Sequence, residues 1–255
     1  MTQPTHADGG DRPWQHPDVR VIHPQPARDA SLDELYGLPR GRVGDRPWVG
    51  LCMIASLDGT TVVDGTSGAL GNETDSAVFA ALRRAADLIL VGAGTVRAEG
   101  YGPPRKPGQR VGVVTARANV DPASELFTSG AGFLILPDDG PPAPVGPAGP
   151  LDEVRAGRGR VDVAVALQRL ERVVDPPTFV QCEGGATLNG ALLLADCVDE
   201  LDLTVSPVMA GGNGPRAAVG ALPVWFGFEL AHLGVDDASY LYTRWIRSAL
   251  TPRPS

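Results

Sequence analysis

Residues 87–95 read Asp-Leu-Ile-Leu-Val-Gly-Ala-Gly-Thr, and this stretch decides the fold class. An apolar run of strand length meets Gly92-Ala93-Gly94-Thr95, where a helix is expected to begin. Gly-x-Gly after a strand lets the backbone approach a pyrophosphate closely, and Thr95 is suited to cap the next helix. The third glycine of a Rossmann fingerprint is replaced by Arg97, so that motif is incomplete. A plain tight turn explains the pattern equally well.

A second junction of the same kind lies near residue 183. The predicted strand 178–182 ends at Glu183, two glycines follow, and a helix is expected over 186–195. Backbone N–H groups at the start of that helix suit a phosphate, whereas a glycine-rich turn with Glu183 as a structural hydrogen-bond acceptor is the alternative. Ligands of parallel α/β sheets bind where strand ends meet helix starts, so both junctions are candidate ligand sites.

Outward from these junctions, strand and helix patterns alternate, which predicts an α/β domain with a mixed sheet. Residues 1–46 are rich in Pro, Asp, Arg and His and are expected to form a polar, partly disordered leader, with a helical turn over 31–36. Residues 47–250 are expected to form a single domain. The other expected strands are 48–55, 87–91, 111–114, 132–136, 199–206, 224–230 and 240–246, with a short one at 60–64; the other helices are 73–86 and 161–173, and 137–150 is a loop.

Composition excludes several classes of function. The net charge of -8 opposes binding to nucleic acid, and neither a membrane span nor a signal peptide is visible, so a cytoplasmic protein is expected. The three cysteines are widely spaced and three of the four histidines lie in the leader, so no metal site is expected. No Gly-x-Ser-x-Gly elbow occurs, which disfavours a serine hydrolase. The chemistry is therefore expected to come from a cofactor.

Four motifs in order resemble one family. They are Ser56-Leu-Asp-Gly59, Val91-Gly-Ala-Gly-Thr-Val96, Glu183-Gly-Gly185, and Val198-Asp-Glu-Leu201 followed by Ser206-Pro207 and Gly211-Gly212. Together they resemble the reductase domain of the riboflavin-pathway deaminase/reductases over about residues 48–246. The resemblance implies a three-layer α/β/α fold like that of dihydrofolate reductase, with a mixed central sheet, NADPH as hydride donor, and a homodimer. The deaminase signatures His-x-Glu and Pro-Cys-x-x-Cys are absent, so a stand-alone reductase is expected.

The resemblance also implies roles for individual residues. It places the cofactor on Gly92, Ala93, Gly94, Thr95, Glu183, Gly184 and Gly185. Thr115 and Arg117 are candidates for its 2′-phosphate, because a hydroxyl and a guanidinium suit a phosphate dianion. Asp58, Ser56 and Glu183 are expected beside the reacting groups, with Asp58 as a proton relay or hydroxyl anchor; a turn-stabilising cap is the alternative for Asp58.

The implied substrate is a phosphoribosylamino-pyrimidine, as in a 5-amino-6-(5-phosphoribosylamino)uracil reductase. The resemblance implies Glu99 as a substrate ligand, because relatives often carry Asp at its place. The small basic island around it suggests Arg105 and Lys106 as ligands of the phosphate, although the same charges suit a solvated loop. The chain departs from its relatives at Ser76, where they tend to carry arginine, and over residues 99–106. These departures keep a non-catalytic NADPH-binding module open as an alternative.

Asp75 supports a further alternative, a dihydrofolate or pterin reductase. Dihydrofolate reductases place a carboxylate on their first helix to pair with the N–C–N edge of a pterin. Asp75 lies in about that region of this sequence. Near the start of a helix, an aspartate is also a favourable partner of the helix dipole without any ligand.

Overall fold

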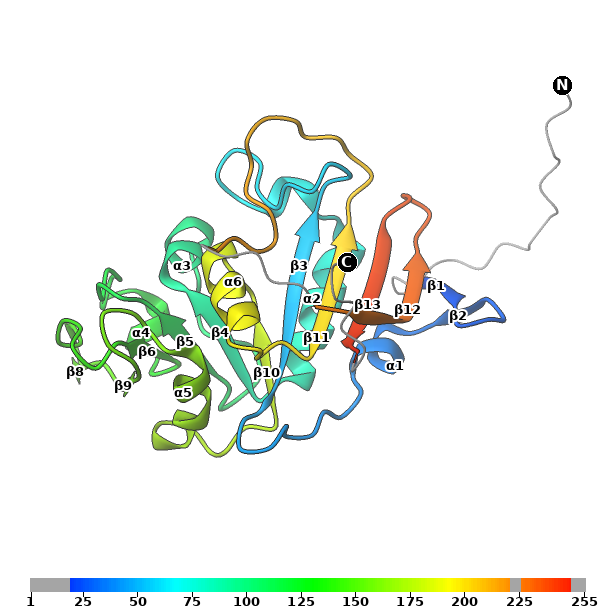
Figure 1. Cartoon of the computed structure of the whole chain (residues 1–255). Coiled ribbons are helices and arrows are strands. Elements are labelled where there is room, and N and C mark those ends of the chain that lie inside the picture. The colour runs from blue at the N-terminus through cyan, green and yellow to red at the C-terminus, as the bar shows by residue number, and fades with distance from the viewer. Residues whose placement is uncertain (1–18, 221–225, 249–255) are drawn as a thin grey trace, which may run out of the picture.

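The structure is a computed structural model that describes residues 19–220 and 226–248. One large mixed sheet runs through the molecule (Figure 1). Its strand order is β2-β1-β12-β13-β11-β3-β10-β4-β5-β6-β9. Neighbours from β11 to β9 are parallel, and those from β2 to β11 are antiparallel. The strands are β1 (Val19–His23), β2 (Arg28–Ala30), β3 (Trp48–Ala55), β4 (Leu88–Gly92), β5 (Arg110–Val114), β6 (Gly132–Leu136), β9 (Glu153–Arg155), β10 (Phe179–Cys182), β11 (Glu200–Val205), β12 (Phe228–Val235) and β13 (Leu241–Arg247).

Helices cover both faces of this mixed sheet, which confirms the predicted three-layer fold class (Figure 1). One face carries α1, α2, α3 and α4, and the other carries α5 and α6. Strand β4 shows why its sequence is apolar throughout: Leu88 and Leu90 pack towards α5 and α6, while Ile89 and Val91 pack towards α3 and α4. The helices are α1 (Leu32–Tyr36), α2 (Glu73–Ala85), α3 (Ala93–Glu99), α4 (Glu125–Thr128), α5 (Val163–Gln168) and α6 (Ala186–Leu194).

Helix α2 is the element that forms one side of the pocket described below. It begins where the Asn72 side chain accepts a hydrogen bond from the backbone N–H of Asp75 at 2.8 Å. Its buried residues Val78, Ala81 and Leu82 recur at helical spacing and face the sheet. Asp75 lies in the first turn of the helix, on the same side as Val78 and Leu82, and lines the pocket.

Several expected elements differ from the structure. Residues 60–64 form no named strand, only a bridge between Val63 and Thr66, because this segment leaves the sheet as a loop. The helix expected over 161–173 is shorter, since a 3-10 turn, Leu170–Arg172, follows α5. The strand expected at 224–230 is found four residues later as β12, and residues 221–225 lie outside the described residues. The loop 137–150 contains a small hairpin, β7 (Val145–Gly146) with β8 (Gly149–Pro150).

Residues 19–46, expected to belong to a separate polar leader, are folded with the rest of the chain. Strand β1 pairs with β12, β2 pairs with β1, and Val19 and Val21 are buried. Strands β1 and β2 therefore extend the main sheet at its antiparallel end, and α1 packs with α2 beside it. The helical turn expected over 31–36 is confirmed as α1, capped by Ser31. The expectation of disorder for residues 1–18 lies outside the described residues.

A buried ion cluster fastens this segment to the sheet. Arg40 donates to both carboxylate oxygens of Glu200 at 3.1 and 2.6 Å, and Arg244 donates to Glu200 at 2.7 and 3.2 Å. The side chain of Arg40 is 2% exposed and that of Glu200 is 0% exposed. Since a buried charge that loses its partner is costly, Arg40 holds residues 36–40 against β11.

We therefore expect Arg40→Met to lower the free energy of unfolding by about 3 kcal/mol, because Arg244 and Glu200 would be left in an incomplete buried cluster. Urea denaturation followed by circular dichroism measures this change. The matched control is Arg84→Met, which removes an exposed pair with Asp33 and is expected to cost less than about 1 kcal/mol. Equal losses in the two variants would show that the cluster does not anchor the segment.

Candidate active site

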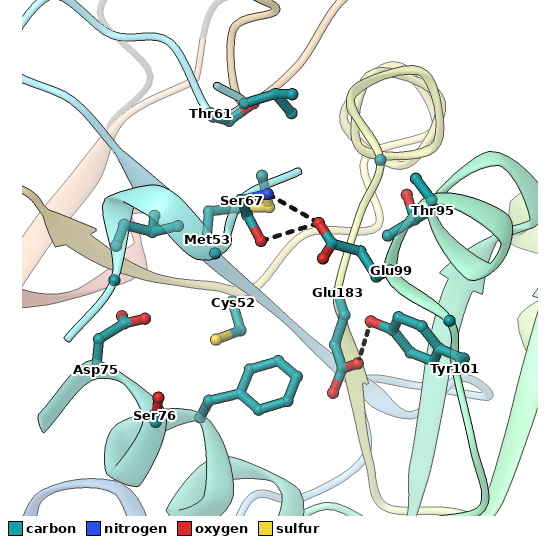
Figure 2. Close-up of a pocket in the computed structure, with 18 of the residues that line it drawn as sticks. Cys52, Met53, Thr61, Ser67, Asp75, Ser76, Thr95, Glu99, Tyr101 and Glu183 are labelled. Atoms are coloured by element: carbon teal, nitrogen blue, oxygen red, sulfur yellow. Dashed lines mark hydrogen bonds between the residues drawn. The ribbon is translucent and has the colours of Figure 1, made fainter. Parts of the chain in front are cut away.

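A pocket of about 840 Å³ lies at the carboxyl ends of the parallel strands. The end of β3 contributes Cys52 and Met53, while the segments after β4 and β10 contribute Thr95 and Gly185. Helix α2 forms the opposite side (Figure 2). Ligands of parallel α/β sheets bind at such strand ends, so this pocket is the candidate active site.

The two glycine junctions meet and form one wall of the pocket, as expected from their places after neighbouring strands. The backbone N–H of Gly92 donates to the carbonyl oxygen of Gly184 at 2.7 Å. A Cβ atom on Gly185 would lie 2.9 Å from Oγ1 of Thr95, so any larger residue there would force the Thr95 side chain to move. Gly94 is open, with no other group within 4 Å of where its Cβ would be. We call residues 92–95 and 183–185 the glycine wall.

Glu183 is anchored by three neighbouring side chains. Arg83 donates to both of its carboxylate oxygens, from Nε and Nη2, at 2.7 Å each. The Tyr101 hydroxyl donates at 2.6 Å and Gln181 Nε2 donates at 3.0 Å. Burial and then the nearby Glu183 charge raise the pKa of Tyr101, so Tyr101 keeps its proton and remains a donor. Glu183 thus ties α2, β10 and the segment after α3 together, and Figure 2 shows its hydrogen bond with Tyr101.

Asp58 lies outside the pocket lining, and its carboxylate holds two loops together. Its carboxylate accepts from the Ser56 hydroxyl at 2.6 Å and from the backbone N–H groups of Ala210 and Gly211 at 3.0 and 2.7 Å. These hydrogen bonds, the one from Ser56 first, lower the pKa of Asp58 to about 2. A group that stays ionised at neutral pH is a poor proton donor, and here the carboxylate braces the loop that holds Ala210 and Gly211. The expected role of Asp58 beside the reacting groups stays a prediction.

The two loops that Asp58 joins are also hydrogen-bonded to each other nearer the pocket. Beside Asp58, the backbone N–H of Leu57 donates to the carbonyl of Val208 at 2.8 Å. Further along, Thr61 donates from its backbone N–H and its hydroxyl to the carbonyl of Pro215, at 2.9 and 3.1 Å. Thr61 and Pro215 both line the pocket. We call residues 56–66 and 206–217 the roof loops.

Two further carboxylates predicted as substrate ligands do line the pocket. Asp75 points into it from the first turn of α2, and burial raises the pKa of its carboxyl group (Figure 2). Glu99, at the end of α3, accepts from the backbone N–H and the hydroxyl of Ser67, at 2.9 and 3.1 Å. Ser76, the position of the expected departure from relatives, also lines the pocket.

The two predicted cationic ligands are placed elsewhere. The ammonium group of Lys106 donates to the carbonyl oxygens of Arg84 and Ala86, at 3.0 and 2.7 Å. It therefore caps the carboxyl end of α2, where the helix leaves unpaired carbonyl groups, and it does not line the pocket. Arg105 is exposed and is also outside the lining. The structure does not bring this pair to the pocket lining, and their part in binding substrate stays a prediction.

Thr115 and Arg117 follow the end of β5, beside the glycine wall in the strand order. The Thr115 hydroxyl accepts from the backbone N–H of Arg117 at 3.3 Å. Thr115 is buried and Arg117 is exposed, and neither lines the pocket. Their place at the neighbouring strand end is compatible with a ligand that extends out of the pocket over β5.

Sequence reasoning missed Arg83 as a site residue. Its guanidinium lies 4.4 Å from the ring centroid of Phe79 and 5.4 Å from that of Tyr101, and both rings line the pocket. Arg83 is the one cation among the described lining residues. The spacing of Phe79 and Arg83, one helical turn apart, was the available signal, but nothing in the sequence pairs Arg83 with Glu183. Within the described residues, no cluster able to hold a metal ion is found, and no helix is long and apolar enough to cross a bilayer.

The fold and the pocket define an α/β protein with a mixed sheet and a ligand pocket at the carboxyl ends of its parallel strands. The chain belongs to the RibD C-terminal domain family, whose model matches residues 47–238. This confirms the family inferred from the four motifs. The chain is 31% identical over 186 residues to a 2,5-diamino-6-ribosylamino-4(3H)-pyrimidinone 5′-phosphate reductase of Methanothermobacter thermautotrophicus. The aligned region covers 68% of this chain and 84% of the relative.

Two solved structures share the fold. A pyrimidine reductase-like protein of Corynebacterium diphtheriae superimposes with a TM-score of 0.69 at 21% identity, over 80% of this chain and 93% of the other. The riboflavin biosynthesis reductase Rib7 of Saccharomyces cerevisiae gives a TM-score of 0.63 at 21% identity, over 86% of this chain and 100% of the other. At this identity the likeness establishes the fold.

We expect Asp58→Ala to loosen the roof loops, because the Ala210 and Gly211 N–H groups would lose their acceptor. Hydrogen exchange measured by mass spectrometry should show faster exchange in peptides covering 206–216. Asp121→Ala is the matched control, since Asp121 accepts a backbone N–H in a distant exposed turn. Unchanged exchange in 206–216 would show that Asp58 does not brace these loops.

Proposed function

We propose that this chain reduces a phosphoribosylamino-pyrimidine of riboflavin biosynthesis, with NADPH as the reductant. The observation that carries the proposal is the pocket between the glycine wall and α2, at the carboxyl ends of the parallel strands. Membership of the RibD C-terminal domain family and the 31% identical pyrimidinone 5′-phosphate reductase support it. The chain is accordingly an oxidoreductase of the pyrimidine reductase type.

The glycine wall fits a nicotinamide dinucleotide. Side chains are absent where the backbone must approach a pyrophosphate, with Gly94 open and Gly185 packed on Thr95. When bound, NADPH supplies a hydride to C1′ of the ribosyl group. The residues that would hold it are Gly92, Ala93, Gly94 and Thr95 with Gly184 and Gly185, and Glu183 positions its loop rather than touching the reacting groups.

The preference for NADPH over NADH is assigned to the end of β5. Arg117 is exposed there, and its backbone N–H donates to the hydroxyl of Thr115. Arg97, on α3, donates to the carbonyl of Asn119 at 2.6 Å and so adds a second positive charge beside the same turn. A 2′-phosphate is bound well by such a pair of guanidinium groups.

Pterin reduction is a second candidate, favoured by one observation. Asp75 points into the pocket from α2, and the single lining cation among the described residues, Arg83, is already paired with Glu183. A heterocycle with several N–H donors, such as a pterin, suits the carboxyl group on this side of the pocket. No feature of the described pocket favours a non-catalytic module. The homodimer and the cytoplasmic location implied by the resemblance stay predictions.

The proposed function is tested by following the ultraviolet absorbance of NADPH with purified protein. We expect consumption with 2,5-diamino-6-ribosylamino-4(3H)-pyrimidinone 5′-phosphate or its deaminated uracil counterpart, and mass spectrometry should show the ribityl product. Consumption with dihydrofolate alone would move the assignment to pterin reduction. Silence with all three substrates, despite bound NADPH, would contradict both candidates.

Arg117→Ala is expected to raise KM for NADPH about tenfold, since a charge-assisted hydrogen bond is worth about 1.5–3 kcal/mol. KM for NADH should stay unchanged, because NADH lacks the 2′-phosphate. Arg105→Ala, an exposed arginine of the same basic island, is the matched control. If both cofactors respond equally, Arg117 has no part in 2′-phosphate recognition.

A further inference from the structure

Three carboxylates reach the pocket within the described residues, and two of them are already engaged by the chain. Glu183 accepts from Arg83, Tyr101 and Gln181. Glu99 accepts twice from Ser67, through one oxygen. Glu183 would have to give up its donors before it could exchange a proton with a substrate, and Glu99 is fixed against Ser67 through one oxygen. The third carboxylate is Asp75.

The surroundings of Asp75 differ from those of the other two. Its side chain projects from the first turn of α2 towards the cavity, on the side opposite Thr95 and the glycine wall (Figure 2). Strand β11 faces it with the Thr204 hydroxyl, and strand β3 faces it with the Cys52 thiol. Arg83, two turns further along α2, is held by Glu183.

These surroundings favour the neutral form of the carboxyl group. Burial raises the pKa of Asp75, and the hydrogen bond with Thr204 offsets only part of this effect. The Cys52 thiol adds no positive charge, because burial raises its pKa, and Asp202, which acts on Cys52, has a pKa well above its usual value. A neutral carboxyl group facing a ligand cavity is able to donate a proton.

The proposed reaction needs such a donor. Opening the ribosyl ring breaks the C1′–O4′ bond while the lone pair of the exocyclic nitrogen forms a C1′=N bond. O4′ leaves with the bonding electrons and becomes a hydroxyl only by taking up a proton. The two electrons that reduce C1′ come with the hydride, so one proton per turnover balances the reaction.

We propose that Asp75 is the catalytic acid that delivers this proton to O4′, an inference that rests on the proposed function. The carboxyl proton passes to O4′ as the C1′–O4′ bond breaks, and Asp75 is left as a carboxylate that takes up a proton from water after the product leaves. The pocket geometry places the acid on the wall that faces the glycine wall, so the ribosyl group is held between them. Asp58 is excluded from this role, because it lies outside the lining and accepts three hydrogen bonds.

The test compares Asp75→Asn with Glu73→Gln in the full chain. Both exchange a carboxyl group for an amide in the first turn of α2, but Glu73 is exposed and does not line the pocket. We expect Asp75→Asn to lower kcat by about 10²-fold or more, the usual contribution of a positioned general acid, with little change in KM. Glu73→Gln should keep the wild-type kcat.

The pH dependence identifies the acid. The active form of Asp75 is protonated, so kcat of the unaltered protein should fall as pH rises through the pKa of Asp75. Asp75→Asn should lack this fall, and Asp75→Glu, which keeps a carboxyl group, should restore it. Carbon-13 NMR of aspartate-labelled protein without ligands supplies a readout besides activity: one carboxyl resonance that titrates above the usual aspartate range should vanish in Asp75→Asn.

The outcomes separate this inference from the proposed function. Turnover of the pyrimidine by the unaltered protein, with wild-type kcat in Asp75→Asn, would overturn the acid role and leave the function in place. A rise in KM at constant kcat would also overturn it, because Asp75 would then only bind substrate. An equal loss in Glu73→Gln would trace the effect to the helix. No turnover by the unaltered protein would overturn the function and the inference together.

Discussion

The pocket depends on the anchoring of one carboxylate, that of Glu183. It accepts both ends of the Arg83 guanidinium and the Tyr101 hydroxyl at 2.6–2.7 Å, and its side chain is 1% exposed. A buried charge must be paired, so three chain segments converge on one point at the end of β10. The distance from α2 to the glycine wall, and with it the width of the pocket, follows from this convergence.

The arrangement divides the work of the site among different parts of the fold. Parallel strands β4 and β10 bring two glycine-bearing turns together, and the Gly92–Gly184 hydrogen bond makes them one surface. Helix α2 supplies the opposite side, and the roof loops close over it through Asp58 and Thr61. The glycine wall and α2 pack on the sheet, whereas the roof loops are held mainly by hydrogen bonds to each other.

The sequence was most informative where function depends on local order. A strand followed by glycines is visible in any short window, and both junctions fell at strand ends that meet. It was least informative where a side chain finds a partner far along the chain. Asp58 bonds residues more than 150 positions away, and β1 pairs with β12, so neither contact leaves a local signal.

Lys106 shows the same limit for charge. A cluster of cations in the sequence suggested a phosphate site, yet the carbonyl groups at the end of α2 attract the same ammonium group. Arg83, by contrast, carries no motif and became visible only when the helix was placed against β10. Local patterns therefore predicted the backbone of the site, and tertiary contacts decided which side chains face its cavity.

The central claim, that the two glycine junctions form one cofactor-binding surface, is tested most directly by hydrogen exchange with and without NADP⁺. The account predicts that peptides covering 92–96 and 183–187 become protected together and by similar factors, while the distant α5 is unaffected. Protection of neither peptide at saturating NADP⁺, or of only one of them, would contradict it.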